Sequence, residues 1–174
     1  MKSIVHSSIF LILSLVILSC AVDNTIDQGT VPEWKILGSA GQGASIDDYL
    51  DLALDLNDYP VVAYVDLAHK ISVKRWDGTH WVFIGSPAFS PVTTDTVDLA
   101  LNSLNQPLVA FISNDNRKAM VMQWDGNSWV TLGEGGISEG IAELIRIALT
   151  KRDKPIIAFK DLSHEGKLTA MIYA

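Results

Sequence analysis

Residues 60–85 read PVVAYVDLAHKISVKRWDGTHWVFIG, and this stretch decides the fold class. Val, Ile, Tyr, Phe and Trp dominate it, and these residues favour β-strands. The opening PVVAY is apolar at almost every position, as expected of a strand that is covered on both faces. Asp77-Gly78 supplies the positive φ that a tight turn needs, so KISVKRW (70–76) and WVFIG (81–85) are predicted to form a hairpin.

The phrases of this stretch each occur three times, and successive copies begin 47 and 48 residues apart. One phrase, WKILG, recurs as WVFIG and WVTLG and begins at Trp34, Trp81 and Trp129. A second phrase, DLALD, recurs as DLALN and RIALT, and a third begins at Pro60, Pro107 and Pro155. Such self-similarity at a fixed period indicates a repeat architecture. The three repeats cover residues 34–80, 81–128 and 129–174, within a region that we place at 32–174.

Each repeat predicts four short antiparallel strands, in the order DLALD, PVVAY, KISVKRW, WVFIG from the inside outward. Each Trp pair flanks a hairpin turn and is expected to pack across two strands, so we assign the tryptophans a structural role. These residues are Trp34, Trp76, Trp81, Trp124 and Trp129. The predicted fold is all-β, a β-propeller with three four-stranded antiparallel blades in this chain. A β-trefoil, which also has three four-stranded repeats, is the alternative.

The pattern P-V-V-A-Y-x-D, followed by K-x-x-V-x-x-W-D-G-x-x-W-x-x-x-G, resembles the repeats of secreted bacterial β-propeller proteins. The resemblance covers residues 34 to 174 and concerns the fold more than the activity, because propellers host binding, scaffolding and catalysis alike.

The repeat begins out of phase with the blades. Trp34–Gly38 would be an outer strand with no blade in front of it, and it could complete the last blade after Tyr173. Propellers typically have 4–8 blades. We therefore expect either a homodimer that completes a six-bladed ring or a fragment of a longer propeller.

The first residues form a targeting segment. Lys2 is followed by the apolar run Ile9–Leu18, which is shorter than the roughly 20 residues needed to span a bilayer. The run ends in Leu18-Ser19-Cys20, which resembles a bacterial lipobox. The resemblance implies a lipoprotein signal peptide (1–19), a lipidated Cys20 and a flexible tether (20–31). It places the protein in the bacterial cell envelope, anchored to the membrane by lipid, with the outer membrane favoured because Ala21 follows the cysteine.

Ligand contacts are expected where long loops gather at one end of the strands. The loops entering the inner strands, 39–50, 86–97 and 134–145, share this end with the turns after the second strands. Their acids suit a cation or sugar hydroxyls, and two aromatic rings could stack on a sugar. The candidates are Asp48, Asp95, Glu143, Asp66, Asp161, Phe89 and Tyr49. Alternatively, the acids cap turns by accepting backbone N–H bonds, and the rings are apolar anchors under the loops.

The composition narrows the function classes. Thirteen Lys and Arg against 20 Asp and Glu give a net charge of −7, which argues against nucleic acid as a partner. No catalytic motif is found, so the chain is not expected to be an enzyme. His69 and His164 fall in different repeats, and neither a metal nor a cofactor is predicted. The favoured function is an envelope binding module for a glycan or protein. The alternative is a structural scaffold that contacts other membrane proteins.

Overall fold

The computed structural model describes residues 33–41 and 45–174, and these residues form an all-β fold. The chain divides into Met1–Trp34, of which only Glu33 and Trp34 are described, and Lys35–Ala174, which holds the strands. The predicted signal peptide, Cys20 and the tether lie outside the described residues. Over the described ranges, the chain contains no helix long and apolar enough to cross a membrane.

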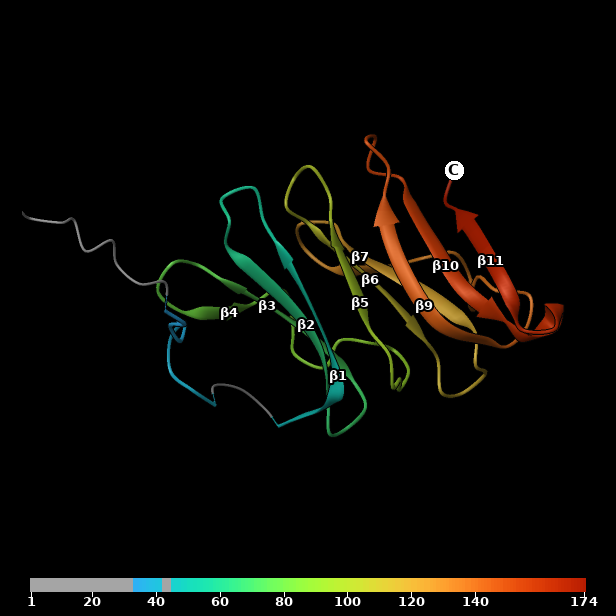
Figure 1. Ribbon diagram of the computed structural model, residues 1–174, viewed down its shortest axis with the longest axis horizontal. Coiled ribbons are helices and arrows are strands. Elements are labelled where there is room, and N and C mark those ends of the chain that lie inside the picture. The colour runs from blue at the N-terminus through green and yellow to red at the C-terminus, as the bar shows by residue number, and fades with distance from the viewer. Residues whose placement is uncertain (1–32, 42–44) are drawn as a thin grey trace, which may run out of the picture. The chain divides into compact units, whose positions relative to one another are not determined.

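The strands form three separate antiparallel sheets that follow one another along the chain (Figure 1). The first sheet consists of β1 (Ile46–Leu54), β2 (Pro60–Asp66), β3 (Ile71–Trp76) and β4 (Trp81–Phe83). The second consists of β5 (Asp98–Leu101), β6 (Pro107–Ile112), β7 (Ala119–Trp124) and β8 (Trp129–Leu132). The third consists of β9 (Ala142–Leu149), β10 (Pro155–Asp161) and β11 (Lys167–Ile172), with a 3-10 turn at Leu162–His164. In each sheet the order agrees with the prediction, from DLALD outward.

The third sheet has three strands, so the prediction of three four-stranded sheets is wrong for this sheet within one chain. The segment expected to supply the missing strand, Trp34–Gly38, has no strand structure. A strand needs a partner for its backbone N–H and C=O groups, and none of the described strands pairs with this segment.

The core lies between the sheets. Alternate residues of β2 and β3, such as Val61, Ala63 and Val73, pack against Val109 and Phe111 of the second sheet. On its opposite face, the second sheet packs against Ile145, Ile157 and Phe159 of the third sheet through Leu108, Ala110 and Val121. The second sheet is therefore covered on both faces, as the unbroken apolar sequence of its PLVAF strand predicts.

Carboxylates join neighbouring inner strands. The Oδ2 atom of Asp51 in β1 accepts a 2.7 Å hydrogen bond from the Leu99 N–H in β5. Asp98 in β5 repeats the contact one sheet further on, where its Oδ2 atom accepts the Ile147 N–H at 2.6 Å. Because both acids open the DLAL phrase, the repeat carries its own link to the next sheet, and β1, β5 and β9 lie side by side (Figure 1).

Candidate functional site

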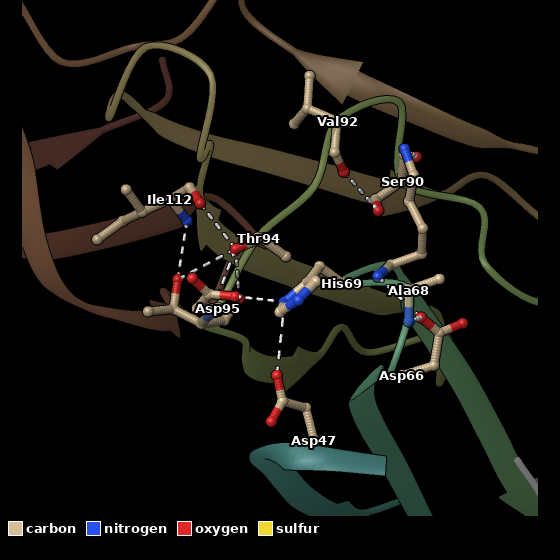
Figure 2. A network of polar contacts seen from close by, with 11 residues as sticks. Asp47, Asp66, Ala68, His69, Ser90, Val92, Thr94, Asp95 and Ile112 are labelled. Carbon is tan, nitrogen blue, oxygen red and sulfur yellow. Dashed lines mark hydrogen bonds and ion pairs between the residues drawn. The ribbon is translucent and has the colours of Figure 1, made fainter. Parts of the chain in front are cut away.

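At the long-loop end, two of the predicted ligand acids cap turns. The Oδ1 atom of Asp66 accepts the backbone N–H groups of Ala68 at 2.9 Å and Lys70 at 3.0 Å (Figure 2). Asp161 is buried and occupies the same position in the third repeat. Its carboxylate accepts hydrogen bonds from Ser163 N at 2.9 Å and from Thr169 Oγ1 at 3.0 Å. Both acids are thus held by their own turns.

The pKa of Asp161 reflects two opposed effects. Burial disfavours the ionised carboxylate, but the hydrogen bonds from His164, Thr169 and Ser163 outweigh it and hold the pKa below its usual range. His164 Nδ1 lies 2.9 Å from Asp161 Oδ2. This histidine is therefore engaged by the acid of its own turn.

Asp95 lies in a polar cluster between the first two sheets, together with Asp47 and His69 (Figure 2). The His69 Nδ1 atom is 2.6 Å from Asp95 Oδ1 and 3.5 Å from Asp47 Oδ2. His69 lies in the turn between β2 and β3 at a φ of 57°, which points its side chain toward the loop before β5. The same loop is fixed by Thr94, whose N–H donates to the His69 carbonyl oxygen at 2.9 Å.

Imidazole and carboxylate are ligand types that divalent cations accept, and the ligand atoms of this cluster lie within 4.8 Å of one another. The next pair of sheets has a different chemistry at the same place. There Arg117, at a φ of 60°, approaches Glu143, with 3.5 Å between Nη2 and Oε1. A guanidinium cannot bind a cation. At both places a basic residue of one turn, His69 or Arg117, lies beside an acid that belongs to the next sheet, Asp95 or Glu143. We therefore interpret the pair as a link between neighbouring sheets.

Glu143 has a second cationic partner. Lys160 Nζ donates to Glu143 Oε2 at 2.9 Å, and this hydrogen bond, with the lysine's charge, lowers the glutamate pKa. Of the three acids expected to ring the long-loop end, Asp95 and Glu143 are therefore paired. The side chain of Asp48 lies outside the described part of the structure.

The two aromatic candidates have different surroundings. Tyr49 in β1 is 40% exposed. It borders a depression with Thr96 and Arg146. Phe89 is half-buried and stacks on Trp129 of the next sheet, with 4.0 Å between ring centroids. Phe89 thus contacts the protein over one ring face, whereas Tyr49 is available to a ligand.

A pocket of about 320 Å³ lies between the first two sheets at a place that our sequence reasoning missed. Its polar lining comes from Arg75 in β3 and from Asn105 and Gln106 in the turn between β5 and β6. Its apolar walls include Phe83 and Trp124. The pocket is built from the short turns and outer strands, not from the long loops on which the candidates were placed.

The side-chain amide nitrogens that line this pocket are unused hydrogen-bond donors among the described residues. Asn105 Oδ1 accepts the Leu56 N–H at 2.9 Å, and Gln106 Oε1 accepts an Asn102 Nδ2–H at 2.9 Å. Both amide oxygens are thus used, while neither amide nitrogen has a partner among the described residues. The Arg75 guanidinium, on an exposed residue of β3, likewise has no hydrogen bond or ion pair to another described residue. Three residues that carry N–H donors therefore line one pocket together with the Trp124 ring.

Comparisons with known proteins agree with this fold. No family model matches the sequence, and a search of curated proteins finds no significant match. Among solved structures, the chain is similar to SapL1 lectin in complex with alpha methyl fucoside, with 19% identity and a TM-score of 0.56. That match covers 75% of this chain and 44% of the SapL1 chain.

A second similar structure is a fucose lectin from Kordia zhangzhouensis in complex with methyl-fucoside. The identity is 15% and the TM-score is 0.47, over 71% of this chain and 91% of the lectin chain.

Proposed function

We propose that this chain is a carbohydrate-binding module and that the pocket between its first two sheets holds a sugar residue. The observation that carries the proposal is that Arg75, whose guanidinium has no partner among the described residues, lines a pocket of about 320 Å³ together with Asn105 and Gln106. Small-ligand pockets typically measure about 300–1,000 Å³ and contain a few convergent polar groups. A monosaccharide fits this description in size and in chemistry.

Sugar hydroxyls accept hydrogen bonds, and the pocket offers donors. The Arg75 fork and the two amide nitrogens can bond hydroxyls that lie close together, and the Trp124 and Phe83 rings can cover the apolar face of a sugar ring. SapL1, which shares the fold, is a lectin whose structure was solved with alpha methyl fucoside. A fucoside is therefore the first ligand to test.

We further propose that each sheet is a propeller-type blade and that the module belongs to a bacterial envelope lipoprotein. Separate sheets stacked face to face favour blades over a β-trefoil. The lipid anchor rests on the sequence around Cys20 alone. Cys20→Ala should release the protein from membrane pellets, and a variant that still pellets with membranes would refute the anchor.

The ligand is tested by titrating the purified chain with methyl α-fucoside and by probing a glycan array. Arg75→Ala should weaken binding by roughly 10- to 100-fold, because a hydrogen bond to a charged group contributes about 1.5–3 kcal/mol. Arg152→Ala is the matched control, since Arg152 is exposed in the turn after β9 and does not line the pocket. Both variants should melt like the wild-type chain.

Two results would contradict the site. Glycan binding that survives Arg75→Ala but is lost in Asp48→Ala would move the ligand to the long-loop end. No binding to any array glycan, with a protein partner recovered by crosslinking, would favour the scaffold function.

A further inference from the structure

The third sheet lacks the outer strand, opened by a tryptophan, that the first two sheets have. In the first two sheets, a tryptophan opens the outer strand opposite an aromatic residue, Trp81 opposite Trp76 and Trp129 opposite Trp124. Tyr173, directly after β11, occupies the same position in the third repeat. None of the described strands pairs with the outer edge of β11.

Each outer-strand tryptophan also bonds to the preceding outer segment. The Trp129 indole N–H donates to the Ile84 carbonyl oxygen at 2.9 Å, and the Trp81 indole N–H donates to the Leu37 carbonyl oxygen at 3.1 Å. The equivalent acceptor for a third tryptophan is the carbonyl of Leu132. The chain therefore makes this tryptophan contact at two places, and the equivalent third place has the acceptor without a tryptophan.

An apolar pocket lies at this third place. Leu132, Ile137, Ile157 and Tyr173 line it. Ile137 is the counterpart of Phe89, because each donates its N–H to the carbonyl oxygen of the first residue of a third strand, Phe89 to Ile71 in β3 and Ile137 to Ala119 in β7. Since Phe89 stacks on Trp129, the pocket beside Ile137 has the position of an absent indole ring.

The chain has one more copy of the outer-strand phrase, WKILG at residues 34–38. Trp34 is fully exposed at 104%, and Ile36 is 70% exposed. Because Leu37 already accepts the Trp81 bond, the end of this segment lies beside the first sheet as the outer strand of a preceding sheet would. It has the sequence of a fourth strand, and no strand in the described part of the chain pairs with it.

The two end sheets, the first and the third, both have apolar outer faces that no described residue covers. In the first sheet, Leu52 and Leu54 are 55% and 58% exposed, although their counterparts Leu99 and Leu101 pack against a neighbouring sheet. In the third sheet, Leu168 is 78% exposed, and its counterpart Ala119 is buried. Each end sheet thus exposes the apolar face that the middle sheet buries.

The turns after the inner strands add a charged pair. Asn105 accepts the Leu56 N–H, and Asp153 accepts the Ser103 N–H, both at 2.9 Å. In the first repeat the position of Asn105 and Asp153 is occupied by an acid, Asp58. In the third repeat the position of Leu56 and Ser103 is occupied by a base, Lys151. Their charges are complementary if the third sheet of one molecule meets the first sheet of another.

We propose that two copies of this chain associate head to tail, with residues 34–38 of each copy adding a fourth strand to β11 of the other. Trp34 fills the pocket beside Tyr173 and donates its indole N–H to the Leu132 carbonyl oxygen. In one chain the two end sheets cover opposite faces of the second sheet, and the apolar residues on their own outer faces stay exposed among the described residues. Two copies give six sheets, within the 4–8 blades typical of closed rings, and a twofold axis makes both junctions identical.

Sedimentation of the full chain tests the association. The wild-type chain should have twice the mass of one chain, Trp34→Ala should give a folded monomer, and Trp34→Phe should retain part of the dimer. Asp58→Asn should keep the dimer, as an Asn makes this contact at position 105, whereas Asp58→Gly should weaken it. A wild-type monomer at all concentrations, or a dimer indifferent to Trp34→Ala, would overturn the proposal. Open polymers would overturn the two-copy ring.

A cysteine pair tests the register independently. Trp76 faces Trp81 and Arg75 faces Val82, so Ile172 should face Lys35 of the other copy. In a Cys20→Ser background, the double variant Lys35→Cys/Ile172→Cys should oxidise to a covalent dimer. Lys35→Cys with Lys167→Cys, which the register keeps apart, is the control. An intrachain disulfide, or equal crosslinking of both variants, would contradict the pairing.

Discussion

Phe89 and Trp129 stack face to face across two sheets, with ring centroids 4.0 Å apart and an interplanar angle of 1°. The Trp129 ring is also tilted against Trp124, with 5.8 Å between centroids, and its indole N–H donates to the carbonyl oxygen of Ile84, directly after β4 of the first sheet. One side chain thus contacts its hairpin partner, the preceding outer strand and the loop that leads to its own sheet. This junction joins the first two sheets at their outer edges.

Phe89→Ala should therefore lower the free energy of unfolding by about 2–3 kcal/mol. A fully buried Phe→Ala change costs about 3–5 kcal/mol, and Phe89 is half-buried. Denaturant titration measures the loss. Phe83→Ala is the control for stability alone, because this ring is exposed, with the Lys74 ammonium 4.5 Å from its centroid, and its loss should cost under about 1 kcal/mol. A Phe89→Ala variant of normal stability that no longer binds glycan would instead make Phe89 a ligand contact.

Gly85 allows the same junction to close. A Cβ atom there would lie 2.7 Å from Trp124 Cζ3 and 2.9 Å from Trp129 Nε1, and the φ of this residue is +76°. Gly85→Ala should thus be destabilised by backbone strain and by the clash. Gly135→Ala is the matched control, since Gly135 has a φ of +62° and open space around it. Strain alone should cost the control about 1–2 kcal/mol. If thermal unfolding shows the same loss of stability for both variants, the tryptophan rings move aside without cost and the clash does not contribute.

The strands, their order and the hairpins were predictable because they depend on local patterns. Alternation and turn residues act over a few residues each, and the period of 47–48 residues shows that they recur in every repeat. The predicted Trp pairs likewise follow from hairpin geometry, and Trp76 and Trp81 lie 5.7 Å apart.

The pocket was not predictable, because its walls come from different repeats. Arg75 meets Asn105 and Gln106 only when the turn of one sheet reaches the third strand of another. One signal was present, since Arg75 is the only charged residue at a position that Gln123 and Ile172 occupy in the other repeats. The pairing of Asp95 with His69 was missed for the same reason. Repetition of an acid indicates a shared role, but it does not reveal the partner across the sheet boundary.

Asp77 should make the stability depend on pH in the acid range. Hydrogen bonds from the backbone N–H groups of His80 and Thr79, and from the Thr79 hydroxyl, lower its pKa to about 2. The unfolded carboxyl has a pKa near 3.9. This stabilising contribution is therefore complete above about pH 4 and is lost as the pH falls toward 2. Melting temperatures between pH 2 and 5 should fall less steeply in Asp77→Asn, and an unchanged slope would contradict this role.

Asp98 should have the opposite effect. Burial, together with the charge of Asp51, raises its pKa above the ordinary value, although the Ile147 N–H and Arg146 favour the ionised form. A raised carboxyl pKa means that the folded state binds the proton more tightly, so this contribution to stability declines as the pH rises through the range above about 3.9.

Asp98→Asn removes the titration and keeps an oxygen that can accept the Ile147 N–H, which now lies 2.6 Å from Asp98 Oδ2. The stability of this variant relative to wild type should therefore be more favourable at pH 7 than at pH 4. Asp98→Ala leaves that buried N–H without a partner and should cost about 1–3 kcal/mol at both pH values. Denaturant titrations at the two pH values measure both differences. A relative stability of Asp98→Asn that instead improves at pH 4 would show that the folded protein stabilises the ionised carboxylate.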